Sequence, residues 1–221
     1  MRLFSDSIGR KVVMAVTGLL MVLFVVGHLL GNLSIFAGPN GINAYALHLH
    51  ELAPLVWGTR VVMLVAVILH LFLAVQVTLE NSAAKPDRYA VKNHLKATFE
   101  SKTMIWTGVI IGLFVAYHLA QFTFRVTGVP VLQDDALGRF DVYEMVVNGL
   151  SAVAIAAVYV IAMVSLFLHL RHGIQSSFQT LGLNNAFLMP RYGAAGKVLS
   201  GIFLVGFGAI PVAVLFGILA R

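Results

Sequence analysis

The 221-residue sequence is 59% hydrophobic and only 11% charged, which is far outside the range of a soluble globular domain. Its formal charge of +6 does not indicate a nucleic-acid partner, because the basic residues fall in short segments between long apolar stretches. The absence of cysteine excludes disulfides and any cysteine-ligated cluster within the chain. We therefore expect an all-α integral membrane protein.

Five uncharged, apolar stretches follow one another along the chain. Each is long enough to cross a hydrocarbon core of roughly 30 Å, which takes about 20 helical residues. We predict one transmembrane domain, 1–221, with helices over about 11–37, 55–81, 103–127, 145–181 and 196–219. The first stretch is longer than the core of a signal peptide and lacks a small-residue cleavage site, so we interpret it as a retained helix.

The segments between these helices differ in length and polarity. After Gly38-Pro39-Asn40-Gly41 breaks the first helix, residues 42–52 form a short amphipathic segment that we expect at the outer surface, and Pro54 ends it. The segment 82–102 is the longest basic loop, and the outer loop 128–144 carries three aspartates. No large domain outside the membrane is indicated, so any soluble chemistry that this protein serves must reside in another polypeptide.

The basic residues are distributed unevenly between the two sides of the membrane. With the N-terminus in the cytoplasm, all of the 15 lysines and arginines lie on the cytoplasmic side except Arg60, Arg125, Arg139 and Arg221. The positive-inside rule therefore predicts a multi-pass protein of the cytoplasmic membrane with its N-terminus inside and its C-terminus outside. The basic face suits anionic lipid headgroups, and it also suits a cytoplasmic partner protein.

Four histidines lie within the apolar spans, one on each of the first four helices: His28, His70, His118 and His169. An ionisable residue at such depth is costly and usually marks function. With a rise of about 1.5 Å per residue, His28 and His118 share a depth toward the outer surface, and His70 and His169 share a depth toward the inner surface. The histidines therefore form two tiers of two.

Two imidazoles at one depth on different helices can fill both axial positions of a heme iron. We expect an outer heme b held by His28 and His118 and an inner heme b held by His70 and His169. The two stacked hemes would lie inside a bundle of helices one to four, with the fifth helix peripheral. A proton relay is the main alternative, whereas a structural zinc site would bring four ligands to one point.

The other histidines are weaker candidates. His172 lies three residues after His169 on nearly the same helical face, so it is either an alternative ligand of the inner heme or a close neighbour of it. His48, His50 and His94 fall in surface segments, where we expect them to be solvated.

Short motifs surround the four intramembrane histidines. They are Thr17-Gly18 and Gly27-His28 in helix one, His70 in helix two, Tyr117-His118 in helix three, and His169-Leu170-Arg171-His172-Gly173 in helix four. In this order they resemble the cytochrome b membrane-anchor subunit of succinate:quinone oxidoreductases, in the five-helix, two-heme branch that includes fumarate reductases. The resemblance covers essentially the whole chain. In that family the helix-four ligand precedes a glycine by four positions, which matches His169 with Gly173 and favours His169 over His172.

The resemblance implies an electron-transfer subunit of a succinate dehydrogenase or fumarate reductase, as used in the tricarboxylic acid cycle or in anaerobic respiration. A flavoprotein subunit with FAD and an iron-sulfur subunit would bind at the cytoplasmic face, and a dimer of such heterotrimers is compatible with it. Two heme b groups would exchange electrons with menaquinone in the membrane. Glu51 is the only acid between helices one and two and is the candidate for quinone-linked proton exchange; an exposed surface carboxylate is its alternative reading.

Two departures from the family pattern stand beside the resemblance. Met14 and Ala15 occupy positions where some relatives carry polar residues near the inner heme propionates, and helix four has no acid in its interior. Two other functions are also open. One is the cytochrome b subunit of a hydrogenase or formate dehydrogenase, which docks its catalytic subunits on the outer face; the other is a heme-free proton-relay transporter.

Overall fold

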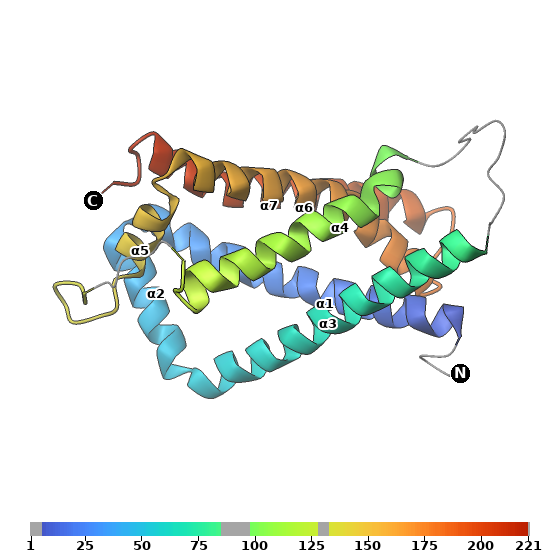
Figure 1. Ribbon diagram of the computed structural model, residues 1–221, viewed down its shortest axis with the longest axis horizontal. Helices are drawn as coiled ribbons and strands as arrows, with labels where there is room; N and C mark the ends of the chain where they lie inside the picture. Colours follow the sequence, from blue (N-terminus) through green and yellow to red (C-terminus); the bar gives the residue numbers. More distant parts are fainter. Residues whose placement is uncertain (1–5, 85–97, 128–132, 221) are drawn as a thin grey trace.

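The computed structural model describes residues 6–84, 98–127 and 133–220. Within these ranges five helical segments are long and apolar enough to cross a membrane, so the predicted all-α architecture with five spans is confirmed (Figure 1). These segments are α1 (Ser7–Leu33) with its 3₁₀ extension η1 (Ser34–Ala37), α3 (Ala53–Ala83), α4 (Phe99–His118) with the π-helical turn η2 (Leu119–Thr123), α6 (Val153–Thr180) and α7 (Leu188–Leu215). Residues 85–97, which include His94 and most of the predicted basic loop, lie outside the described ranges.

Two short helices lie at one end of the bundle, across the ends of the long ones (Figure 1). The first is α2 (Pro39–Glu51), which corresponds to the predicted amphipathic segment. Gly38 precedes it with φ of +80°, a backbone conformation that glycine adopts without steric cost, and this lets the chain turn sharply out of α1. Pro54 lies in the first turn of α3, where its missing N–H removes no intrahelical hydrogen bond.

The second short helix, α5 (Val142–Leu150), corrects the prediction of one continuous helix over 145–181. Asp141 caps its N-terminus by accepting a hydrogen bond from the backbone N–H of Glu144. The chain then leaves the helical conformation at Ala152, whose ψ is 125°, before α6 begins. Hydropathy does not detect the break, because the apolar character continues through it.

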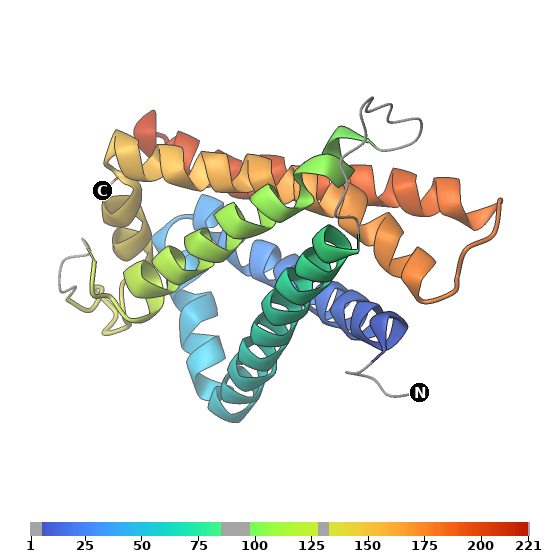
Figure 2. The ribbon, with the colours of Figure 1, turned by 45° about the vertical axis from the view of Figure 1, so that its right-hand side comes forward.

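The long helices pack in a definite order. α6 and α7 lie side by side, α4 packs along α6, and α1 packs along α3 while also contacting α6 and α7 (Figures 1 and 2). Buried Phe203 on α7 joins Leu29 on α1 with Leu170 and Ile174 on α6 in one hydrophobic cluster. The expectation of a peripheral fifth helix is therefore wrong, since α7 forms part of the core.

Candidate functional site

The structure brings the four intramembrane histidines together in two pairs. The rings of His28 on α1 and His118 on α4 have centroids 5.9 Å apart, with an interplanar angle of 83°. The rings of His70 on α3 and His169 on α6 have centroids 6.4 Å apart, with an angle of 62°. These are the pairs expected from helical depth, and each pair joins two helices that are not consecutive in the chain.

Both separations suit one metal ion between two imidazoles. A metal–imidazole nitrogen bond is about 2 Å and the ring centre lies roughly 1 Å further on, so two rings on opposite sides of one ion have centroids about 6 Å apart. Within the described ranges, no group of three or more His, Cys, Asp or Glu side chains could hold a metal ion. The donor set therefore fits a metal whose remaining ligands come from a cofactor, as in heme, and does not fit a structural zinc site.

Hydrogen bonds determine which nitrogen of His70 is free. Its Nδ1 lies 3.0 Å from the backbone oxygen of Met14 and 3.4 Å from Oγ1 of Thr17. A carbonyl oxygen can only accept, so Nδ1 carries the hydrogen and donates it. The lone pair of Nε2 is then available for a metal.

His169 is held in a similar way by Thr107 on α4. The Thr107 hydroxyl donates to the backbone oxygens of Thr103 and Met104, each at 3.1 Å. Its oxygen is therefore left to accept from Nδ1 of His169, at 3.2 Å. The hydroxyl of Thr107 thus favours the same tautomer that the Met14 carbonyl imposes on His70.

A longer chain of hydrogen bonds leads to His118. The side-chain amide of Gln121, which is fully buried, donates to the backbone oxygen of Gly149 at 2.8 Å, so its Oε1 faces the other way. That Oε1 accepts from the hydroxyl of Tyr159 at 2.9 Å, and the Tyr159 oxygen lies 3.1 Å from Nδ1 of His118. Because the tyrosine hydrogen is already donated to Gln121, Nδ1 of His118 must be the donor, which again leaves Nε2 free.

The surroundings of His28 are mostly aromatic. Its ring stacks on Phe24, with centroids 5.6 Å apart and an angle of 13°, and lies 5.7 Å from the ring of Phe207 on α7. The side-chain amide of Asn32 donates to the backbone oxygen of His28 at 2.8 Å and lies 3.3 Å from both ring nitrogens. The protein contacts therefore orient this ring without selecting a tautomer.

The remaining candidates are not members of the two ring pairs. His172 is half-buried on α6, but the ring that contacts His70 is that of His169. Glu51 is the last residue of α2, with 67% of its side chain exposed, and its Oε2 lies 3.6 Å from Nδ1 of His48. Among the described residues, no hydrogen bond or ring contact joins Glu51 to His28 or His118.

Sequence reasoning missed three residues of this site: Thr107, Tyr159 and Gln121. The signal that could have found them is the same as for the histidines, a polar side chain inside an apolar helix. Gln121 is also placed by η2, because the π-helical turn after His118 changes the direction of the side chains that follow it.

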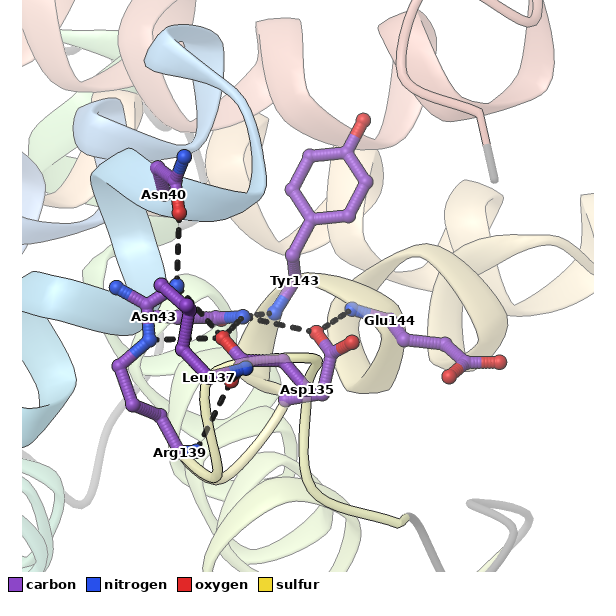
Figure 3. A network of polar contacts seen from close by, with 8 residues as sticks. Asn40, Asn43, Asp135, Leu137, Arg139, Tyr143 and Glu144 are labelled. Carbon is purple, nitrogen blue, oxygen red and sulfur yellow. Dashed lines mark hydrogen bonds and ion pairs between the residues drawn. The ribbon is translucent and has the colours of Figure 1, made fainter.

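A second polar network closes the bundle at the end where α2 and α5 lie (Figure 3). Asn43 is fully buried; its amide nitrogen donates to Asp135 and Asp141, each at 3.1 Å, and its oxygen accepts from the backbone N–H of Tyr143 at 2.9 Å. The guanidinium of Arg139 donates to Asp135 from Nε at 2.8 Å, and this holds the pKa of the Asp135 carboxyl well below its usual range. The network ties α2 to the loop before α5.

Comparison with known proteins relates the chain to a family of membrane subunits. Residues 78–186, about half of the chain, match the family model of the succinate dehydrogenase/fumarate reductase transmembrane subunit. The chain belongs to this family. The match runs from the end of α3 through α4 and α6, so it includes His118 and His169. No curated protein and no solved structure matches the sequence.

As a succinate dehydrogenase/fumarate reductase transmembrane subunit, the chain is a multi-pass membrane anchor that associates with the catalytic subunits of the complex. Subunits of this family often bind heme b. Among the described residues, the two histidine pairs have a donor set that suits such a cofactor.

Proposed function

We propose that this anchor subunit carries two b hemes and transfers electrons through them between the iron-sulfur subunit of the complex and menaquinone in the membrane. The observation that carries the proposal is that the four intramembrane histidines form two close pairs of imidazole rings, each pair from two different helices. Their separations suit one iron each, and in His70, His118 and His169 the hydrogen bonds leave Nε2 free to bind it.

The protein's part in this function is to hold, orient and bury the ligands. His28 and His118 would hold one heme, and His70 and His169 the other. When bound, heme supplies a one-electron carrier whose potential depends on its axial ligands, on the hydrogen bonds to those ligands and on burial. The four ligand side chains are partly buried on apolar helices that are long enough to cross the membrane.

Menaquinone and the role of Glu51 rest on the family resemblance, as does the cytoplasmic position of the flavoprotein and iron-sulfur subunits. The exposure of Glu51 at the end of α2 suits a group that exchanges protons with the aqueous phase, and its Oε2 lies 3.6 Å from Nδ1 of His48. The distribution of lysine and arginine supports a cytoplasmic N-terminus in the cytoplasmic membrane.

A reduced-minus-oxidised spectrum with pyridine-hemochrome quantitation of the purified complex tests the proposal. We expect about two b hemes per chain, one of which is lost in His28→Ala and the other in His70→Ala. His50→Ala is the matched control, because His50 is exposed at the end of α2, and it should retain both hemes. A folded complex that contains no heme would refute the proposal and favour a heme-free proton relay.

A further inference from the structure

A sequence pattern occurs twice in the chain. Methionine, two residues, Thr-Gly, nine residues and histidine run from Met14 to His28 and again from Met104 to His118. Every member of the second copy lies 90 positions after its counterpart in the first. The first copy is on α1 and the second on α4.

The geometry around the two copies repeats as well. Thr17 on α1 lies 3.4 Å from Nδ1 of His70 on α3, and Thr107 on α4 lies 3.2 Å from Nδ1 of His169 on α6. Each hydroxyl also lies within hydrogen-bond distance of the backbone oxygens three and four residues earlier in its own helix. Each threonine can therefore donate to its own helix and accept from the histidine.

The glycine after each threonine gives the histidine ring room. A Cβ on Gly18 would lie 3.2 Å from Cε1 of His70, and a Cβ on Gly108 would lie 3.4 Å from Cε1 of His169. The motif therefore combines a hydroxyl that accepts from one edge of the ring with a backbone that the ring can approach closely.

One ion pair joins α1 to α3, and another joins α4 to α6. Arg10 on α1 pairs with Glu80 on α3 at 2.8 Å, and Glu100 on α4 pairs with Arg171 on α6 at 3.0 Å. Arg10 and Glu100 are also 90 positions apart, so the equivalent position carries opposite charges in the two halves.

We infer that the membrane domain consists of two equivalent halves, α1 with α3 and α4 with α6, and that Thr17 and Thr107 are equivalent positioning residues. Each half supplies one histidine to each pair. In each half the threonine of the first helix lies within hydrogen-bond distance of Nδ1 of the histidine of the second, and at His70 it does so beside the Met14 carbonyl, which already fixes Nδ1 as the donor. The consequence for iron rests on the proposed function: both threonines tune the same heme, the one between His70 and His169.

Redox potentiometry of the purified complex tests this inference. A hydrogen bond from Nδ1 increases the electron donation of Nε2 to iron and favours the oxidised state. Thr17→Val and Thr107→Val should therefore each raise the midpoint potential of the same heme and leave the other heme unchanged. The shift should be smaller for Thr17→Val, because the Met14 carbonyl still accepts from Nδ1 of His70. Thr17→Ser and Thr107→Ser, which keep the hydroxyl, should retain the wild-type potential. Thr78→Val is the matched control, because the exposed Thr78 hydroxyl donates to the backbone oxygen of Ala74 and makes no hydrogen bond to any histidine in the described part of the chain.

The outcomes separate this inference from the proposed function. A wild-type complex without heme defeats the proposed function. If the wild-type complex contains two hemes, and the heme potentials of Thr17→Val and Thr107→Val equal those of Thr78→Val, the inference alone is overturned. If a valine variant loses heme, the serine variant decides: recovery of heme with a wild-type potential supports the role of the hydroxyl, and failure to recover it overturns that role.

A different observation carries a second inference, on the other pair. We infer that Tyr159 and Gln121 are positioning residues for His118. Their hydrogen bonds run in one direction from His118 to the backbone of Gly149, across α4, η2, α5 and α6, and Gln121 is fully buried on a π-helical turn. A helix irregularity next to a buried polar chain is typical of a functional site.

Tyr159→Phe tests the second inference. It should raise the potential of the heme between His28 and His118 and leave unchanged the heme that responds to Thr17→Val. Tyr117→Phe is the matched control, because the Tyr117 ring lies 6.5 Å from that of Tyr159 while its hydroxyl makes no hydrogen bond to a described histidine. Equal potentials in the two phenylalanine variants would overturn this role.

Discussion

Replacement of Asn43 by alanine is the most direct test of how the α2–α5 end of the bundle is held together. The Asn43 side chain is fully buried and makes three hydrogen bonds, to Asp135, to Asp141 and to the backbone N–H of Tyr143 (Figure 3). Alanine removes all three and leaves their partners without this side chain. We expect the loop before α5 to open more readily, while the five spans stay folded.

The magnitude follows from the number of bonds lost. A hydrogen bond contributes about 1 kcal/mol net, so three amount to about 3 kcal/mol, or about a hundredfold in the local opening equilibrium. Asn40→Ala is the matched control. Asn40 is exposed and its oxygen accepts one hydrogen bond, from Arg139 at 2.8 Å, so its loss should cost about 1 kcal/mol or less, no more than about fivefold.

Hydrogen–deuterium exchange measured by mass spectrometry, on the complex in lipid nanodiscs, reads this opening directly. The informative amides are those of Leu137, Arg139, Tyr143 and Glu144, whose N–H groups donate to side chains of the network. Asn43→Ala should accelerate their exchange far more than Asn40→Ala does. Equal acceleration by the two variants would show that the buried amide does not hold the loop.

Two further predictions concern pH and helix packing. Arg139 lowers the pKa of Asp135 in the folded state, so the carboxylate stabilises the loop at any pH above its unfolded pKa of about 3.9, and this stabilisation is lost as the pH falls further. Hydrogen exchange at the Arg139 amide, corrected for intrinsic rate, should therefore stay constant from pH 7 to 5 and rise below about pH 4. A rise already between pH 7 and 5 would contradict this. Gly31→Ala should lower the unfolding temperature, since its Cβ would lie 2.5 Å from the Tyr45 ring and overpacking costs about 1–3 kcal/mol. In Gly201→Ala the new Cβ would have nothing within 4 Å, so the unfolding temperature should stay unchanged or rise. The same shift in both variants would refute the packing argument.

The fold was largely predictable because its main signals are local. The length and apolar character of each stretch identify a membrane span without any knowledge of its neighbours. The constant rise of a helix also converts the positions of His28 and His118, and of His70 and His169, into matching depths. Both pairs found in the structure follow from this arithmetic.

The boundary errors have physical causes that hydropathy cannot register. The break between α5 and α6 depends on the cap at Asp141 and on the extended backbone at Ala152, although the sequence stays apolar there. The core role of α7 depends on where Phe203 and Phe207 lie relative to other helices. Both features are set by packing rather than by composition.

By itself, the sequence determined the number of spans, the tiers of histidine and the kinship with a respiratory membrane anchor, since apolar length, helical rise and motif order are all properties of the linear chain. Only the tertiary structure decided which side chains hold those histidines. Thr17 and His70 are 53 residues apart, and Thr107 and His169 are 62 apart. A hydrogen bond depends on a distance of about 3 Å and on direction, and for residues so far apart in the chain both exist only once the helices have packed.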